Sequence, residues 1–315
     1  MNRSMRFPGA NFRQRPRDFS VWARLCLVPA LLLLGLEAIA GAGDEIPAAG
    51  LPPDKGSYSL FHPVPRNLMR PMILDRPDKT ESPYTVDAGH VQMEMDLINY
   101  SWDRENGEGG DVTTAGFSAG AMNWKVGLVN HIDLQVIVQS FNRLRVDDPA
   151  AGPPVVRSGF GEVLNRLKIN LWGDDGGSTA LAVMPFVTWP TAGNDLGATD
   201  VEGGIVIPFA VELPAGWGLG MMTQVEVRPG AEGDGIDNSF INTVTVGHDL
   251  IGPLAAYAEF FSEVRTESGS LWIGTVDLGL TWTLNDDWIL DAGINIGVTR
   301  SAPDLNPFAG LSCRF

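Results

Sequence analysis

Apolar and polar residues alternate along most of this chain, and the alternation limits the folds that it can adopt. Past residue 45 no uninterrupted apolar run reaches the about 20 residues that a helix needs to cross a bilayer. From Tyr84 to Phe315 the chain divides instead into segments of about 10–14 residues, in which apolar residues alternate with polar or small ones and turn residues mark the ends. This pattern predicts an all-β protein.

Twelve β-strands follow from this pattern. A strand of a transmembrane barrel needs about 9–11 residues to cross the hydrocarbon layer, and every predicted strand is long enough to do so. The predicted strands are residues 84–102, 113–127, 132–145, 160–172, 179–189, 201–213, 217–228, 239–249, 254–265, 271–284, 288–300 and 305–315.

The connections between these strands are of two kinds, which alternate along the chain. An up-and-down barrel with both chain ends in the periplasm has long outer loops and short inner turns in this order, whereas a soluble β-sandwich gives no reason for it. We therefore predict a transmembrane, up-and-down antiparallel β-barrel over residues 84–315, in the bacterial outer membrane. The long polar connections are 103–112, 146–159, 190–200, 229–238, 266–270 and 301–304, and the short ones are 129–131, 173–178, 214–216, 250–253 and 285–287.

Tryptophan positions favour a barrel in lipid. An indole ring has an apolar body and one N–H donor, so it prefers the boundary between lipid tails and headgroups. Eight of the nine tryptophans lie near the ends of predicted strands and form two expected membrane-interface girdles: Trp102, Trp189 and Trp272 at the outer ends, and Trp124, Trp172, Trp217, Trp282 and Trp288 at the inner ends.

The two faces of each strand differ in polarity. In 288–300, for example, Leu290, Ile294 and Val298 share one face, whereas Asp291 and Asn295 share the other. No amphipathic helix is present in the sequence to cover the apolar faces, so lipid is expected to cover them. Outer-membrane lipids and lipopolysaccharide are therefore expected partners.

The first 42 residues are predicted to be a cleaved signal peptide. Six arginines precede or flank an apolar core at 25–36, and an Ala38-Ile39-Ala40 sequence that a signal peptidase can cut follows it. The alternative, a membrane anchor, is disfavoured because the core is too short to span a bilayer. Removal of residues 1–42 changes the formal net charge from −16 to −20, and a chain this acidic is not expected to bind nucleic acid.

Residues 43–83 are rich in proline and show no strand-like alternation. We predict that they form an irregular periplasmic leader. A folded plug is the rival interpretation, but about 40 such residues are too few for a core of their own.

The chain ends in a phenylalanine, Phe315, at the end of the last predicted strand. A terminal aromatic residue with less polar residues at alternate positions before it resembles the signal that the barrel-assembly machinery reads. We therefore expect this machinery and periplasmic chaperones to be partners, with Phe315 as the assembly signal.

Charged residues are predicted on the inward face, where they divide into two walls. A field across a narrow aqueous pore and a set of buried ion pairs that fill the interior are both compatible with the sequence, because 12 strands enclose a space that side chains could still fill. The predicted pore-lining residues are the basic Lys125, Arg143, Arg166 and Lys168, and the acidic Glu94, Asp96, Glu259, Glu263, Asp277 and Asp291.

No motif in the sequence makes a convincing catalytic or metal site. Gly116 to Gly120 matches G-x-S-x-G, but it lies inside one alternating segment with no helix after it, so the strand–turn–helix of a nucleophile elbow is missing. A barrel lipase would need a histidine near the outer leaflet, and none of the four is predicted there. No catalytic residue, cofactor or metal ligand is assigned.

Several segments carry a family resemblance. The sequence GEVLNRLKINLWG at 161–173, together with 99–104 and Pro185-Phe186, resembles the outer-membrane transporters associated with the meta-pathway of phenol degradation. Members usually carry Gly-Asp where this chain has Gly161-Glu162. The resemblance covers residues 80–315 and implies a barrel with a transport role.

Three functions are considered. The first is an outer-membrane channel or transporter for small solutes, with aromatic or weakly polar compounds favoured only by the family resemblance. The second is a closed-lumen structural or interaction barrel that acts through its acidic outer loops. The third and least favoured is a barrel lipase.

Overall fold

The computed structural model describes residues 54–104, 111–230, 235–267 and 270–315. The predicted signal peptide, residues 1–42, and residues 43–53 of the predicted leader lie outside the described residues. Within the described ranges, no helix is long and apolar enough to cross a membrane. The helical elements there are two short 3-10 turns, η1 (Arg66–Leu68) and η2 (Pro214–Gly216).

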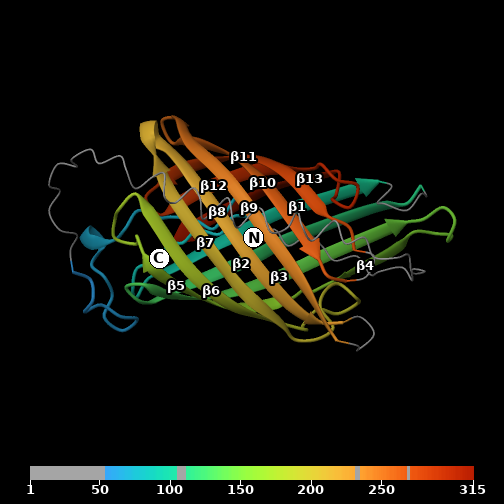
Figure 1. Ribbon diagram of the computed structural model, residues 1–315, viewed down its shortest axis with the longest axis horizontal. Helices are drawn as coiled ribbons and strands as arrows, with labels where there is room; N and C mark the ends of the chain where they lie inside the picture. Colours follow the sequence, from blue (N-terminus) through green and yellow to red (C-terminus); the bar gives the residue numbers. More distant parts are fainter. Residues whose placement is uncertain (1–53, 105–110, 231–234, 268–269) are drawn as a thin grey trace. The chain divides into compact units, whose positions relative to one another are not determined.

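A single antiparallel sheet closes on itself to form the barrel (Figure 1). Consecutive strands pair along the chain, and the first strand β1 also pairs with the last strand β13. The strands are β1 (Val91–Arg104), β2 (Thr113–Val129), β3 (Ile132–Asp147), β4 (Val155–Gly159), β5 (Val163–Trp172), β6 (Thr179–Trp189), β7 (Glu202–Leu213), β8 (Trp217–Pro229), β9 (Ile236–Ile251), β10 (Leu254–Arg265), β11 (Ile273–Asn285), β12 (Trp288–Gly297) and β13 (Leu305–Arg314).

The barrel has twelve strand positions, as predicted, because β4 and β5 occupy one of them. Both pair with β3. Between them Gly161 N donates to Gln139 O at 2.9 Å and Gln139 N donates to Glu162 O at 3.1 Å, so the ladder continues across the interruption. The predicted start of the first strand at residue 84 is wrong: β1 begins at Val91, and residues 84–90 continue the segment before it.

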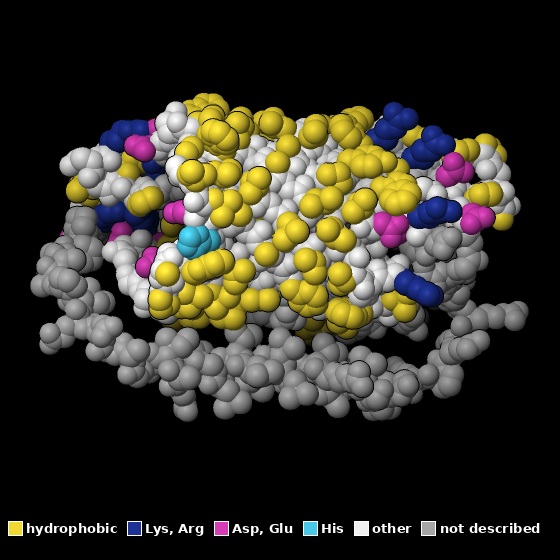
Figure 2. Space-filling model, turned by 90° about the horizontal axis from the view of Figure 1, so that it is seen from above, with side chains coloured by type: hydrophobic (Ala, Val, Ile, Leu, Met, Phe, Trp, Pro, Cys, Tyr) yellow, Lys and Arg dark blue, Asp and Glu magenta, His cyan; other side chains and the backbone are white. Residues whose placement is uncertain are grey.

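Hydrophobic side chains cover the outside of the barrel between its ends. On the face in Figure 2, charged side chains gather toward the two ends of the molecule. Seven of the eight predicted girdle tryptophans are more than a third exposed, and Trp102 is partly exposed. At the end of the chain, Phe315 N donates to Val91 O at 2.8 Å, so the last residue pairs with the start of β1.

The inside–outside alternation reverses once in each of the first three strands. Leu97 and Ile98 are both exposed in β1, and Gly120 in β2 has a positive φ of 65°. In β3 the buried positions change from odd to even numbers between Gln139 and Asn142. The three reversals are neighbours in the sheet. β2 lies between β1 and β3, and both strands pair with the residues of β2 that flank Gly120.

A residue outside the regular pleat shifts the period of two by one position, so the residues beyond it face the opposite side. Arg143 lies beyond the reversal in β3, and it is exposed on the outer surface. The prediction that Arg143 lines the lumen is therefore wrong. The sequence shows no interruption of the strand at this point, so a period-two count continues through it and assigns Arg143 to the wrong face.

Candidate functional site in the barrel lumen

A segment that precedes β1 lies inside the barrel. Its residues contact inward-facing side chains of β1, β2 and β5 on one side and of β9, β10, β11 and β12 on the other. Strands on opposite sides of a closed barrel can be contacted together only from the lumen. We call residues 73–87 the luminal segment.

The luminal segment is irregular, as the proline content predicts, but part of the predicted leader fills the barrel. The sequence argued against a plug because so few residues cannot form a core. The segment needs no core of its own, since the charged barrel walls supply its partners.

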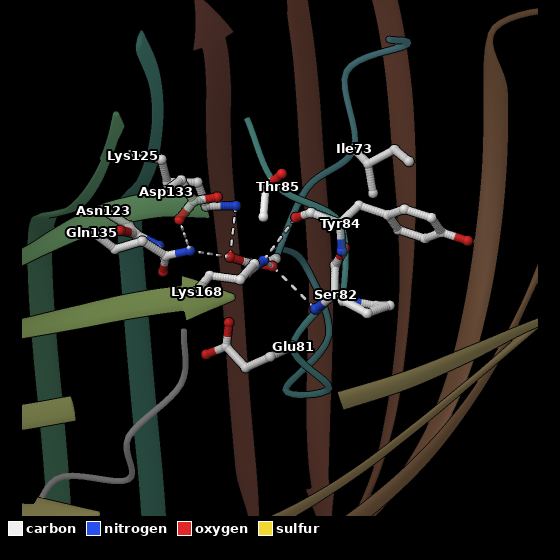
Figure 3. A network of polar contacts seen from close by, with 12 residues as sticks. Ile73, Glu81, Ser82, Tyr84, Thr85, Asn123, Lys125, Asp133, Gln135 and Lys168 are labelled. Carbon is white, nitrogen blue, oxygen red and sulfur yellow. Dashed lines mark hydrogen bonds and ion pairs between the residues drawn. The ribbon is translucent and has the colours of Figure 1, made fainter. Parts of the chain in front are cut away.

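Asp75 is the centre of one half of this network. Figure 3 shows Lys125, Gln135, Lys168 and Ser82, which all contact its carboxylate. Its carboxylate oxygens lie 2.6 Å from Lys125 Nζ and 2.6 Å from Lys168 Nζ. Ser82 N and Gln135 Nε2 also donate to this carboxylate, at 3.0 and 3.4 Å. The Asp75 N–H donates to both carboxylate oxygens of Glu94 at 3.1 Å. A buried carboxylate with several charge-assisted partners holds its neighbours in one arrangement.

Arg76 binds two acidic residues, one on β1 and one on β12. Its Nε and Nη2 donate to Asp291 at 3.1 and 2.7 Å, and its Nη1 pairs with Asp96. Lys79 Nζ lies 3.0 Å from Asp277, while the Lys79 N–H donates to Glu259 at 2.8 Å. Adjacent residues of the segment therefore bind walls of opposite charge.

The two predicted walls thus do not meet, and the segment lies between them. Among the described residues no ion pair joins the basic wall of β2 and β5 to the acidic wall of β10–β12. Instead Asp75 and Glu81 bind the basic wall, with Glu81 Oε2 at 2.8 Å from Arg166 Nη2, and Arg76 and Lys79 bind the acidic one. Of the two arrangements considered from sequence, buried ion pairs are present in the lumen, but they join each wall to the segment rather than one wall to the other.

The structure buries nine of the ten predicted pore-lining residues. Arg143 is the exception. Lys125 and Glu94 also pair with each other across neighbouring strands, and Glu263 pairs with Arg265 at 2.6 Å. The buried residues are Glu94, Asp96, Lys125, Arg166, Lys168, Glu259, Glu263, Asp277 and Asp291.

The pKa of Asp75 makes the docking of the segment sensitive to acid. Burial alone would raise this pKa, but Lys125, Lys168 and Arg166 outweigh burial and hold it well below its usual range. A depressed folded-state pKa contributes stability above the ordinary pKa of about 3.9, and that stability is lost as pH falls further. We expect a spin label at Ser82→Cys to become more mobile as pH falls below about 4. The same label in an Asp75→Asn background should lose most of this pH response; an unchanged response there would assign it to other carboxylates.

Two cavities lie next to the tip of the luminal segment, which we define as residues 79–81. The outer one has a volume of about 190 Å³ and is lined by Lys79 and Glu81 together with outer-half residues of the strands. The inner one has a volume of about 420 Å³ and lies between Ile73–Tyr84 and the inner halves of β7–β11. Thr80 Oγ1 lies 2.6 Å from both Thr243 Oγ1 and Glu259 Oε1. Thr80 lines the inner cavity, and Glu81 lines both cavities.

The outer cavity has one apolar wall, which the sequence analysis missed. Its residues face inward from β3 and from β5–β9, whereas Asp96, Asn99, Glu263, Asn295 and Asn306 line the cavity elsewhere. The strand at 179–189 is apolar on both faces, and this was the available signal. We call the following residues the apolar band: Ile137, Leu164, Phe186, Val206, Met222 and Ile241.

The glycine-rich start of β8 and the G-x-S-x-G match both lie in the barrel wall. The glycines at 216–220 lie at η2 and the start of β8, and a Cβ at Gly220 would come within 2.7 Å of Thr245 and 3.3 Å of Thr80. Gly220 therefore leaves room for the segment to approach. Ser118 of the G-x-S-x-G match lies within β2 and faces inward, buried.

An antiparallel barrel with an apolar exterior, a charged interior and a segment bound inside it defines an outer-membrane β-barrel with a partly filled lumen. The family model described as "Putative MetA-pathway of phenol degradation" matches residues 74–315, which include most of the luminal segment. The chain belongs to this family. The resemblance seen in the sequence is thereby confirmed.

One solved structure shares the fold, and two others are less similar. The COG4313 outer membrane channel from Pseudomonas putida F1 is 14% identical with a TM-score of 0.56, and the alignment covers 77% of this chain and 100% of that one. The translocator domain of autotransporter NalP from Neisseria meningitidis is 10% identical with a TM-score of 0.42, covering 72% and 88%. The loop-deleted OmpT of Vibrio cholerae is 11% identical with a TM-score of 0.37, covering 71% and 99%. No curated protein sequence matches the chain.

Proposed function

We propose that this protein is an outer-membrane channel for small, weakly polar solutes, aromatic compounds among them. The apolar band in the outer cavity is the observation that carries the proposal. The interior of an outer-membrane barrel is usually polar, so a continuous inward-facing band of Ile, Leu, Phe, Val and Met needs a reason. A weakly polar solute supplies one, since it buries apolar surface at roughly 25 cal/mol per Å².

The polar part of the cavity complements this band. Asn99, Asn295 and Asn306 line this part and hydrogen-bond one another: Asn306 Nδ2 donates to Asn99 Oδ1 at 2.7 Å, and Asn295 Nδ2 donates to Asn306 Oδ1 at 2.9 Å. Together they form a polar surface that suits a hydroxyl or carbonyl group of the solute. A ring could therefore lie against Phe186 and Val206 while its polar substituent faces the asparagines. A mostly apolar pocket with a small number of positioned polar groups is typical of small-molecule sites.

The passage between the cavities runs beside the tip of the luminal segment, at Thr80. Glu81 lines both cavities, and its neighbour Thr80 lines the inner one. A solute that moves from one cavity to the other passes this part of the segment, and it crosses when the hydrogen bonds of Thr80 to Thr243 and Glu259 open. The alternative of a closed-lumen barrel has these same bonds in its favour, since they hold the segment against the barrel wall.

Uptake into liposomes tests the proposal. We expect Val206→Asn to lower the flux of a phenol-sized aromatic by about fivefold, because about 1 kcal/mol of apolar contact is lost, while flux of a small sugar stays unchanged. Val227→Asn, on the exposed face of β8, is the matched control. Equal flux of the aromatic through all three proteins would remove the apolar band from the proposal, and a wild-type protein that never conducts in a planar bilayer would establish the closed barrel.

We also propose partners at the ends of the strands. The exposed tryptophans are placed to contact lipid headgroups and lipopolysaccharide. Phe315, exposed at the end of β13, is placed to serve as the signal for the assembly machinery and its chaperones. The absence of a catalytic function is likewise a proposal, supported by the position of Ser118 inside a strand.

A further inference from the structure

Two arginines of β3 lie on the outer surface of the barrel near its outer end. Arg143 is exposed and has no side-chain partner among the described residues. Arg145 is exposed and pairs with Asp147 on its own strand at 3.1 Å. A charge on the lipid-facing wall is costly at the bilayer midplane and nearly free at the interface. The two arginines therefore mark a place where the wall meets something other than lipid tails.

The strand register gives the height of these arginines. Arg143 pairs with Phe117, and Phe117 pairs with Tyr100 of β1. By the same register Arg145 is two strands away from Trp102, in the row of that girdle residue. Strands of a barrel tilt by about 35–45° and lie about 4.8 Å apart, so two strands along a row change the height by about 6 Å. Tyrosine and tryptophan prefer the headgroup level, so the arginine side chains lie within reach of the lipid phosphates.

Two aromatic side chains, Phe117 and Phe141, lie next to the arginines on the outer surface. Phe141 precedes Arg143 on the same face of β3, and its ring meets that of Phe117 edge to face with centroids 6.3 Å apart. Phe141 lies on the side of Arg143 toward the middle of the barrel wall, and Phe117 lies beside Arg143 in the same row. The surface thus offers cations at the headgroup level and aromatic rings next to them.

We propose that Arg143 and Arg145 bind phosphate groups of lipopolysaccharide in the outer leaflet. A guanidinium group forms paired hydrogen bonds with a phosphate, and two residues apart on a strand is a separation of about 6.6–6.8 Å, which lets both arginines reach one headgroup. Arg143 contributes more, since Arg145 shares its charge with Asp147. The inference rests on the outer-membrane location and is independent of solute conduction.

Native mass spectrometry of the folded barrel in detergent with diphosphoryl lipid A tests the proposal. We expect Arg143→Gln/Arg145→Gln to bind about ten- to thirtyfold more weakly than wild type. Arg143→Lys should lose less, because it keeps the charge without the paired hydrogen bonds. Arg300→Gln is the matched control, since Arg300 is exposed at the outer end of the barrel after β12.

Two further measurements distinguish the phosphates of the lipid from its acyl chains and from free phosphate. Dephosphorylated lipid A should bind wild type and the double variant equally, and inorganic phosphate in large excess should fail to displace the lipid. Heat-modifiable migration on gels establishes that each variant is folded. Equal binding of diphosphoryl lipid A by folded wild type and double variant overturns the proposal, as does an equal loss in Arg300→Gln.

Discussion

Asp75→Asn is expected to release the luminal segment and to raise single-channel conductance severalfold. Asparagine keeps the size of the side chain but leaves Lys125 and Lys168 without their shared counterion. Removal of one partner from a buried charge network costs about 3–5 kcal/mol, which is enough to undock a segment held by a few such contacts. Bilayer recordings together with the mobility of a spin label at Ser82→Cys measure the two effects.

A second substitution distinguishes charge from shape in this experiment. Lys168→Gln in the Asp75→Asn background removes one surplus cation, so it should restore part of the docking. Asp54→Asn is the control, because Asp54 is exposed and bonds only the local Gly56 N–H at 2.9 Å. If conductance of Asp75→Asn equals that of wild type while the label stays immobile, Asp75 does not hold the segment.

Gly310→Ala should displace Arg76 from both of its carboxylates. Gly310 of β13 pairs with Asp96 on one side and Asp291 on the other, and the guanidinium lies over its Cα. A Cβ at this position would lie 2.1 Å from Arg76 Nη2, so the side chain must move away. Two buried carboxylates would then lose their partner, at a cost of about 3–5 kcal/mol.

The temperature at which the barrel converts to its heat-modified form measures this effect. Gly218→Ala is the control, since Gly218 is also in the barrel wall and a Cβ there would meet only Gly247 O at 4.0 Å. We expect a clear decrease for Gly310→Ala and none for Gly218→Ala. Equal melting of the two variants would show that Arg76 does not contribute to barrel stability.

The barrel could be predicted because its signals are local. Strand number and loop order follow from turn residues and from a period of two, and this period also identified inward carboxylates such as Asp277 and Asp291. The same period failed at Arg143, because one irregular residue per strand reverses every position beyond it. No residue in 139–141 marks this irregularity in the sequence, and only the glycine opposite, Gly120, could have suggested it.

The luminal segment could not be predicted, because its contacts join residues far apart in sequence. Asp75 and Lys168 are separated by 93 positions and Arg76 and Asp291 by 215. One signal was present in the sequence. The five charged residues between positions 75 and 81 alternate in sign within a proline-rich stretch. Charge complementarity to two opposite walls explains that pattern once the walls are known, whereas composition alone suggested a solvated leader.

The hold of Arg76 on both Asp96 and Asp291 also constrains the order in which the molecule is completed. These carboxylates belong to β1 and β12, which lie on either side of β13, so the arginine bridges the seam where the first and last strands meet. Closing this seam and seating the segment stabilise each other, as thermodynamic linkage requires. A barrel that closes without the segment lacks the ion pairs of Arg76 across this seam, and with the seam open Arg76 can reach only one of the two carboxylates. Closure of the barrel and docking of the segment are therefore coupled steps of assembly.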